Sequence, residues 1–346
     1  MSTLGLDIGG ANLKAVYLSS EKADREVQTT NVPFAMWERW KDLSMALRKI
    51  SQDFDIAEHT RIAVTMTGEL ADCFACRREG VEFIAGAVEE AFAGREISFY
   101  QTDGNWCKRE SASDNWKLLA ASNWHAMARS AAEFLPNETG LMIDIGSTTT
   151  DVIPIVSGQV MAVGKTDFQR LRNHELIYAG VGRTPVCSLI KCVELSGVTI
   201  PLSREFFATI DDALIWLNLI PENVVDMNSA DGRSRSRANA GRRLARMICS
   251  DLDEIDVGVI DSIATTTIAA FESLFVEAVE INIARHQDGI QSVLLLGTGS
   301  FLSDRILSER FASLQRISFC DIVEEGCSES GPAYAVAKLA QQRQAI

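Results

Sequence analysis

Leu141–Asp151 reads LMIDIGSTTTD, and this stretch decides the fold. The pattern predicts a buried strand over 141–145, a tight polar turn, and a second strand over 152–156. Asp144 stands near the end of the apolar run, where burying an unpaired charge costs several kcal/mol. We therefore expect Asp144 to be paired or to face a cleft. Gly146 permits positive φ, and successive backbone N–H groups of such a turn can converge on an anion.

The same arrangement occurs near the start of the chain, where Leu4–Val16 reads LGLDIGGANLKAV. Asp144-x-Gly146 thus repeats Asp7-x-Gly9 after 137 residues. A repeat at this distance is too long for a solenoid and indicates two related halves that face one another. Lys14 stands on the returning strand between apolar neighbours, so we expect it in a cleft near the turn. A surface lysine is the alternative.

The composition is that of a soluble globular protein, with 47% hydrophobic and 23% charged residues among 346. No uninterrupted apolar run approaches the ~20 residues of a membrane span, and no secretory signal precedes the first predicted strand. A net charge of −14 argues against general binding to nucleic acid or acidic membranes. We expect a cytoplasmic protein with small-molecule partners; its oligomeric state is open, a homodimer included.

The cysteines are predicted to be reduced thiols, because several lie in apolar segments and no secretory signal is present. Cys73-Phe-Ala-Cys76 is a single CxxC with no second pair at the spacing of a zinc site. Thiols packed on a helix are favoured over a metal or redox role. The eight positions are Cys73, Cys76, Cys107, Cys187, Cys192, Cys249, Cys320 and Cys327.

A third small-residue turn, Gly297-Thr298-Gly299-Ser300, follows a predicted buried strand over 292–296 and precedes a helix that starts near Phe301. Such a strand–turn–helix unit offers helix-start N–H groups to a phosphate or nucleotide. Elsewhere the pattern predicts strands and helices, with a final helix that begins at Ser330-Gly331-Pro332. The strands are expected over 3–7, 13–18, 61–65, 97–101 and 159–163, and the helices over 38–52, 116–134, 206–219, 240–251 and 256–286.

Several polar residues outside these turns have two interpretations. Glu69 either starts a helix or contacts a ligand. His125 is expected to be a packed, hydrogen-bonded side chain. The segment 165–185 is typical of a functional loop. The arginines that follow the Ala230–Arg233 loop indicate either a solvated helix start or a phosphate site; they are Arg233, Arg235, Arg237, Arg242, Arg243 and Arg246.

In order and spacing, the three turns resemble the phosphate and adenosine loops of the actin-like ATPase superfamily, which includes sugar kinases and actin. Within it the chain looks closest to the hydantoinase A/oxoprolinase group. The resemblance implies an α/β fold of two actin-like ATPase (ribonuclease H-like) domains with a ligand cleft between them. Residues 1–138 would carry the first phosphate loop. Residues 139–346 would carry the second loop, a polar insert and the nucleotide-type loop, with the final helix free to pack back on the first half.

A narrower resemblance is to a family linked to tetrahydromethanopterin-dependent one-carbon transfer, whose archaeal members are methanofuran-biosynthesis enzymes. Gly68 stands where the archaeal pattern has alanine, and the acidic, cysteine-containing chain suggests a bacterial version. The motifs that carry the match are LDIGGANLK (6–14), VTMTGEL (64–70), IDIGSTTTDVIP (143–154), TDFQRL (166–171), ELIYAG (175–180), RTP (183–185) and ADGR (230–233).

This resemblance implies transfer of an (aminomethyl)furfuryl group from its diphosphate to the phenol oxygen of a glutamyl-tyramine or tyrosine acceptor, with release of pyrophosphate. The bond between a furfuryl carbon and its diphosphate breaks readily, because the furfuryl cation that results is stabilised. Catalysis therefore needs the charge of the diphosphate to be neutralised and the acceptor oxygen to be held in line with the breaking bond. Asp7 and Asp144 would hold Mg²⁺ or another divalent cation, directly or through water. ATP binding is possible, but no consumption is expected. Asp151 and Asp167 are the candidate bases for a phenol of pKa about 10, and a turn cap is the alternative for Asp151.

Three groups of site residues follow. The catalytic group is Asp7, Lys14, Asp144, Asp151 and Asp167. Contacts to diphosphate or nucleotide are expected from Gly9, Gly10, Asn12, Gly146, Ser147, Thr148, Thr149, Gly297, Thr298 and Gly299. Contacts to substrate are expected from Glu69, Arg170, Tyr178, Arg183, Asp231 and Arg233. Two other functions remain open: an ATP-dependent small-molecule kinase or hydantoinase-like hydrolase, recognised by ATP turnover, and a non-catalytic nucleotide-binding regulator, recognised by binding alone.

Overall fold

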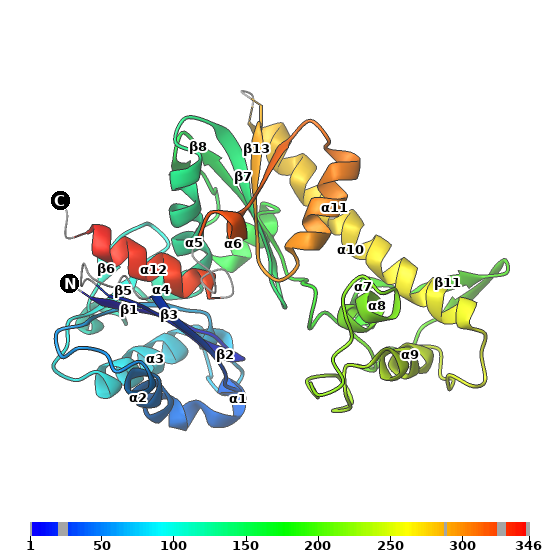
Figure 1. Ribbon diagram of the computed structural model, residues 1–346, viewed down its shortest axis with the longest axis horizontal. Coiled ribbons are helices and arrows are strands. Elements are labelled where there is room, and N and C mark those ends of the chain that lie inside the picture. Colours follow the sequence, from blue (N-terminus) through cyan, green and yellow to red (C-terminus); the bar gives the residue numbers. More distant parts are fainter. Residues whose placement is uncertain (1, 20–26, 287–288, 324–329, 344–346) are drawn as a thin grey trace.

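The computed structural model describes residues 2–19, 27–286, 289–323 and 330–343, and these form two mixed sheets (Figure 1). The first sheet has the order β3-β2-β1-β4-β5-β6. Its strands are β1 (Thr3–Ile8), β2 (Asn12–Leu18), β3 (Val27–Pro33), β4 (Arg61–Met66), β5 (Ile97–Tyr100) and β6 (Trp106–Cys107). The second sheet has the order β10-β8-β7-β13-β14, with β9 paired to β8. Its strands are β7 (Thr139–Ile145), β8 (Thr150–Val156), β9 (Gln159–Val160), β10 (Leu176–Ile177), β13 (Ser292–Leu296) and β14 (Gln315–Ser318).

Both sheets follow one plan, in which an antiparallel hairpin is joined by a parallel strand. In the first sheet β1 pairs antiparallel with β2 and parallel with β4. In the second sheet β7 pairs antiparallel with β8 and parallel with β13. The two hairpins are those predicted from the repeated acid-plus-glycine stretch, so the predicted repeat of two halves is confirmed at the level of strand pairing.

Helices cover both sheets and fill the space between them (Figure 1). α5 (Asn123–Ala131) and α12 (Gly331–Gln342) pack on each other, and α12 also contacts β1, β2 and β4. Their buried side chains, with Met142 and Leu294 of the second sheet, form one apolar cluster. α2 (Leu43–Asp53) and α3 (Arg77–Ala91) lie under the first sheet, while α10 (Val257–Arg285) and α11 (Ser300–Arg310) contact strands of the second. The chain therefore closes by returning its last helix to the first half.

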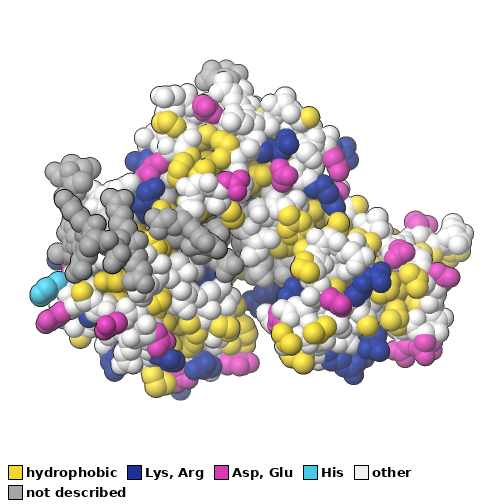
Figure 2. All heavy atoms as spheres, viewed as in Figure 1, with side chains coloured by type: hydrophobic (Ala, Val, Ile, Leu, Met, Phe, Trp, Pro, Cys, Tyr) yellow, Lys and Arg dark blue, Asp and Glu magenta, His cyan; other side chains and the backbone are white. Residues whose placement is uncertain are grey.

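A third lobe leaves the second half after β10 and was not separated from it in the sequence prediction. It packs on the N-terminal part of α10 and lies across a notch from the first half (Figures 1 and 2). Its elements are α7 (Val186–Leu189), β11 (Cys192–Leu195), β12 (Val198–Pro201), α8 (Ile210–Trp216) and α9 (Arg237–Arg246). The remaining short elements of the chain are α1 (Met36–Arg39), η1 (Trp40–Asp42), η2 (Gly68–Leu70), η3 (Arg109–Ser111), α4 (Trp116–Leu119), η4 (Ala132–Phe134), α6 (Asp167–Arg172) and η5 (Phe319–Asp321).

Four predicted helices differ from the structure. The helix expected over 240–251 is α9, which begins and ends earlier in the chain. The helix expected over 116–134 is broken between α4 and α5, where Ala121 has φ +52. The helix expected over 206–219 is α8 alone, because Thr209 caps its start in a capping box with Asp212. The helix expected over 38–52 is interrupted by η1. By contrast, α10 spans almost the range predicted for it and is capped by Asp256, whose side chain accepts from Gly258 N.

α10 is long and apolar enough to cross a membrane by length and composition, and no other helix of the described residues is. The sequence analysis expected no apolar run of this length and therefore missed α10. Acidic residues interrupt the apolar sequence of this helix. Its apolar residues Ile263, Phe271 and Phe275 lie in the main hydrophobic core. Core helices of this kind pass the same test, so α10 is weak support for a membrane span.

The cysteines that the structure describes are all free thiols, and Cys327 lies outside the described residues. Cys73 and Cys76 do not pack on a helix as predicted. They lie in the bend before α3, with Cys76 at the position that precedes its first turn. The Cys73 thiol donates to Met36 O at 3.6 Å.

Candidate active site at the seam of the two halves

The two acid-plus-glycine turns have the same internal geometry. Gly9 N donates to Asn12 O at 3.0 Å, and Gly146 N donates to Thr149 O at 2.9 Å. Each turn closes its hairpin so that the acid of the first strand lies opposite a charged residue of the second. Asp7 lies opposite Lys14, whereas Asp144 lies opposite Asp151. The first half thus places a cation beside its acid, and the second half places another acid there.

The third turn, Gly297-Thr298-Gly299, packs closely against Asp144. β13 runs parallel to β7 with Leu296 beside Asp144, so Gly297 follows directly at the end of the strand. Gly297 has φ +81, and a Cβ there would lie 2.2 Å from Asp144 Oδ1. Gly299 N donates to Ile145 O at 2.8 Å, and α11 begins at Ser300. Only glycine fits at 297, because both the backbone conformation and the approach to the carboxylate exclude a side chain.

Electrostatic interactions link the acids of the two halves. Burial, Asp151 and Asp7 raise the pKa of Asp144 to about 7, while Lys14 opposes the rise. Burial raises the pKa of Asp7 as well, and Lys14 and the Thr65 hydroxyl oppose it. Since Asp144 lies in the field of both Asp7 and Lys14, these three charged groups share one region between the halves. A ligand that brings positive charge would stabilise both carboxylates in their ionised form.

The donor chemistry of this region fits a hard divalent cation. Mg²⁺ prefers carboxylate oxygens and keeps several waters or phosphate oxygens as further ligands. The Asp144 carboxylate accepts no hydrogen bond from any part of the chain that the structure describes, and its oxygens face Gly297. The described residues contain no group of three or more His, Cys, Asp or Glu side chains that could hold a metal ion by themselves. Asp7 and Asp144 therefore fit an ion only if substrate or water completes its coordination.

The segment 178–183 is hydrogen-bonded to the second turn, at Gly146 and Ser147. Val181 N donates to Gly146 O at 3.0 Å, and Gly182 N and Arg183 N donate to Ser147 O at 3.0 and 2.8 Å. A Cβ at Gly182 would lie 2.2 Å from Ser147 Oγ, which explains the glycine. This attachment fixes the predicted substrate residues Tyr178 and Arg183 beside the second turn.

A chain of ion pairs crosses from the second half to the first. Arg170 of α6 is buried, pairs with Asp151 of β8, and donates to Asp167 Oδ1 at 2.8 Å. Asp167 lies 3.7 Å from the guanidinium of Arg77, which donates to Glu69 Oε1 at 3.1 Å. Four predicted site residues, Asp151, Asp167, Arg170 and Glu69, are thereby brought into one network. Both candidate bases, Asp151 and Asp167, are held by arginine.

Aromatic residues support this network, and the sequence analysis did not identify them as part of the site. The Arg170 guanidinium lies 4.4 Å from the ring centroid of Trp124 in α5. The Arg183 guanidinium lies 5.5 Å from the ring centroid of Trp37 in α1, so it contacts the opposite half. Arg77 was also missed, since its partners stand 8 and 90 residues away in sequence. His125 is a packed side chain as predicted: it is buried, and Tyr100 Oη lies 3.0 Å from its Nδ1.

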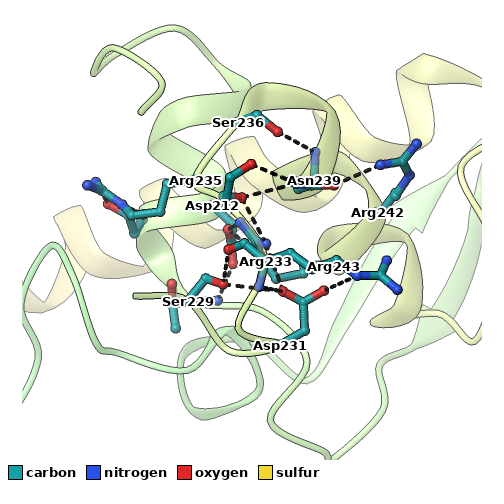
Figure 3. A network of polar contacts seen from close by, with 12 residues as sticks. Asp212, Ser229, Asp231, Arg233, Arg235, Ser236, Asn239, Arg242 and Arg243 are labelled. Carbon is teal, nitrogen blue, oxygen red and sulfur yellow. Dashed lines mark hydrogen bonds and ion pairs between the residues drawn. The ribbon is translucent and has the colours of Figure 1, made fainter. Parts of the chain in front are cut away.

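Asp231 and Arg233 lie in the third lobe and belong to a separate network (Figure 3). Asp231 Oδ1 accepts from Ser229 Oγ at 3.2 Å and from Arg243 Nη1 at 3.0 Å. Arg243 is fully buried and also donates to Asp212 Oδ1 at 2.8 Å. Arg235 is likewise held by two acids, Asp211 and Asp226. The predicted solvated helix start is thus wrong for Arg243.

No hydrogen bond or ion pair in the described part of the chain joins Asp231 to the three turns. A cavity of about 360 Å³ also lies in the third lobe, between the end of α8 and Arg237. Its lining residues belong to the lobe and include none of the predicted site residues. A role of Asp231 and Arg233 in substrate binding stays a prediction.

Comparison with known proteins places this site in context. The sequence profile of the hydantoinase/oxoprolinase family matches residues 61–343. Over 340 residues the chain is 33% identical to the (4-{4-[2-(gamma-L-glutamylamino)ethyl]phenoxymethyl}furan-2-yl)methanamine synthase of Methanocaldococcus jannaschii. This alignment covers 98% of each protein. The chain is 31% identical over 201 residues to the synthase of the same name from Methanococcus vannielii. That alignment covers 58% of this chain and 89% of the M. vannielii protein.

A solved structure, the nucleotide-free form of an acetone carboxylase described as ATP-dependent, superposes with a TM-score of 0.59 at 10% identity. The match covers 97% of this chain and 70% of that one. At this identity the likeness concerns the fold alone. Together with the repeated hairpins, it confirms the predicted α/β fold of two actin-like halves.

Proposed function

The chain belongs to the hydantoinase/oxoprolinase family, and from this premise we propose that it is a transferase of methanofuran-type cofactor biosynthesis. It transfers an (aminomethyl)furfuryl group from its diphosphate to the phenol oxygen of a glutamyl-tyramine or tyrosine acceptor and releases pyrophosphate. The observation that carries the proposal is the 33% identity to the M. jannaschii synthase over 98% of both chains. The product named for that enzyme contains a phenoxymethyl-furan, which is the aryl ether that such a transfer forms.

The site offers what this chemistry requires. Breaking the bond between the furfuryl carbon and the diphosphate leaves negative charge on the diphosphate, which must be stabilised by fixed positive groups. Gly9 N and Gly146 N are bonded within their own turns. The other N–H groups of these two turns and the ammonium of Lys14 are the groups of this chain that would bind the diphosphate. Asp7 and Asp144 would hold Mg²⁺, and that ion, when bound, supplies further charge neutralisation at the leaving group.

The third turn, Gly297-Thr298-Gly299, has the form of an adenosine loop, yet the proposed reaction needs no ATP. The diphosphate on the furan is already a leaving group, so no second activation is required. ATP would bind as a competitor for the phosphate turns. The enzyme would work in the cytoplasm of a cell that uses tetrahydromethanopterin-linked one-carbon transfer.

Product analysis by mass spectrometry tests the proposal. Purified protein is incubated with (aminomethyl)furfuryl diphosphate, Mg²⁺ and either the tyramine or the tyrosine acceptor, with and without ATP. We expect the aryl ether of one acceptor to form without ATP, and the preferred acceptor then identifies the substrate. An ether that forms only with ATP, or phosphorylation of an acceptor, would instead support the kinase reading of the same turns.

A further inference from the structure

Glu69 is a buried acid at the seam with one unused oxygen. It follows Gly68, whose position allows the backbone to lie against the first turn: a Cβ at Gly68 would be 3.0 Å from Gly9 O. Glu69 Oε1 accepts from Arg77, whereas Oε2 is buried and accepts no hydrogen bond within the described residues. A buried carboxylate oxygen without a partner is costly, so its retention points to a partner that arrives with a ligand.

The other four acids between the two halves are less suited to accept the phenolic proton. Asp151 and Asp167 are each paired with the buried Arg170, and Asp167 also lies 3.7 Å from Arg77. Glu69 pairs with Arg77 too, but through Oε1 alone, which leaves Oε2 without a partner among the described residues. Asp7 and Asp144 lie beside the phosphate turns, where a proton acceptor is not needed. Among these five acids, only Glu69 has a fully buried carboxylate oxygen that accepts no hydrogen bond from the described residues.

Three apolar or aromatic side chains with high exposure belong to residues next to the acids of this network in sequence or within their electrostatic reach. Leu70 follows Glu69 directly, and Phe168 follows Asp167; their exposed fractions are 49% and 73%. Tyr178 is 54% exposed. Partial burial of its ring raises the pKa of the Tyr178 hydroxyl, and Asp167 and Glu69 add to the rise, so the hydroxyl lies within the electrostatic reach of both acids. We call Leu70, Phe168 and Tyr178 the acceptor rim. Exposed apolar residues that gather at a polar site are typical of a surface that receives an aromatic ligand.

We propose that Glu69 is the catalytic residue that accepts the phenolic proton of the acceptor, whose ring packs on the acceptor rim. This proposal rests on the proposed function. The phenolic O–H proton passes to Glu69 Oε2, and the phenolic oxygen forms a bond to the furfuryl methylene carbon. The bond from that carbon to the diphosphate breaks, and its electron pair leaves with the diphosphate. Glu69 afterwards releases the proton to water.

The surroundings of Glu69 suit this task. Burial raises its pKa to about 7, the Arg77 guanidinium limits the rise, and Asp167 adds to it. The other charged group facing this region is Arg183, which contributes to the field at Tyr178. A base is most useful when its pKa lies near the working pH, because it is then both ionised and able to hold a proton.

The test compares Glu69→Gln with the exposed control Glu90→Gln; Glu90 lies on α3 and, among the described residues, its carboxylate pairs with Arg48 alone. Each variant is assayed with the natural phenol and with a ring-fluorinated acceptor that is already ionised at the assay pH. We expect Glu69→Gln to lose about 100-fold or more in turnover with the natural phenol and to recover to within a few-fold of wild type with the fluorinated one. Glu90→Gln should match wild type with both.

Full activity of folded Glu69→Gln with the natural phenol would overturn the proposal. An equal loss with both acceptors would also overturn it, because a structural role is not rescued by an acidic phenol. If the variant does not fold, the wild-type pH profile decides. With the fluorinated acceptor the acid limb near pH 7 should become less steep, because the contribution of Glu69 is lost while that of Asp144, whose pKa is also about 7, stays. An acid limb of equal steepness with both acceptors would contradict the proposal. Failure of wild type to form an ether from either acceptor is a separate outcome, which rejects the proposed function itself.

Discussion

The guanidinium of Arg77 in the first half lies 3.7 Å from the carboxylate of Asp167 in the second half. It also donates to Glu69 at 3.1 Å, and Asp167 in turn accepts from Arg170 at 2.8 Å. One side chain thus connects the buried acid of one half with the ion pairs of the other. A change at this position alters the electrostatics of both.

Arg77→Met is expected to shift the pH dependence of activity. Arg77 lowers the pKa of Glu69, so its removal raises that pKa above about 7. The acid limb of kcat/KM against pH should then move to higher pH by roughly one unit. Arg78→Met is the matched control, because Arg78 is half exposed and pairs with Glu82 on the same helix. An unchanged limb in Arg77→Met, or an equal shift in both variants, would contradict this reading.

Asp144→Asn is expected to raise stability at neutral pH and to lower activity. The folded protein holds a proton on Asp144 up to about pH 7, whereas the unfolded chain releases it near pH 4. Stability is therefore lost as pH rises through this window, and the Asn variant avoids that loss.

Urea unfolding should give Asp144→Asn an advantage of about 1–4 kcal/mol at pH 7.5 and none at pH 4. Turnover should fall about 100-fold, the scale of losing one electrostatic contact in the transition state. Asp53→Asn, an exposed acid on α2, serves as the control. A variant that is less stable than wild type at pH 7.5 and retains full specific activity would make Asp144 a structural residue.

Gly297→Ala is expected to disrupt the third turn. Its Cβ would lie 2.2 Å from Asp144 Oδ1, and its φ of +81 is strained for alanine. Gly197 has φ +80 with no atom near its Cβ position, so Gly197→Ala carries the backbone strain alone. We expect a loss of about 1 kcal/mol in Gly197→Ala and at least 2 kcal/mol more in Gly297→Ala, measured by urea unfolding. Equal losses would show that the approach to Asp144 is unimportant.

The acid-plus-glycine turns could be predicted because their information is local. A strand, one acid, a glycine and a returning strand stand within about a dozen residues, and the repeat at Asp7 and Asp144 gave the facing halves. Arg77 could not be found in this way, because its partner Asp167 comes from the other half of the chain. Neither could the break before α5, since Ala121 adopts φ +52 without a glycine or proline to indicate it.

The arginines between 233 and 246, in the third lobe, also show that local sequence does not predict partners that are distant in the chain. Spacing on a helix suggested solvent or phosphate as the partner of Arg243, but the actual partners, Asp212 and Asp231, stand 31 and 12 residues earlier. Only tertiary packing brings these charges together in a buried site. Charge pattern alone therefore did not distinguish a binding surface from an internal ion-pair network.

Asp231→Ala and Arg233→Ala separate structure from substrate binding in this lobe. Asp231 pairs with a fully buried arginine, so its loss should destabilise the protein by about 2–4 kcal/mol in thermal or urea unfolding. The Arg233 side chain is 55% exposed, and its loss should leave stability unchanged. If Arg233 binds substrate as predicted, KM for the acceptor should rise about 10-fold in Arg233→Ala. An unchanged KM would remove it from the site.

The proposed transferase differs from every ATP-dependent reading of the fold in its second product. Pyrophosphate and ADP are therefore followed in one reaction mixture that contains (aminomethyl)furfuryl diphosphate, the phenolic acceptor, Mg²⁺ and ATP. We predict one pyrophosphate for each aryl ether formed, no ADP, and the same yield when ATP is omitted. Formation of ADP in proportion to product, with no product in the absence of ATP, would contradict the transferase and establish an ATP-dependent enzyme.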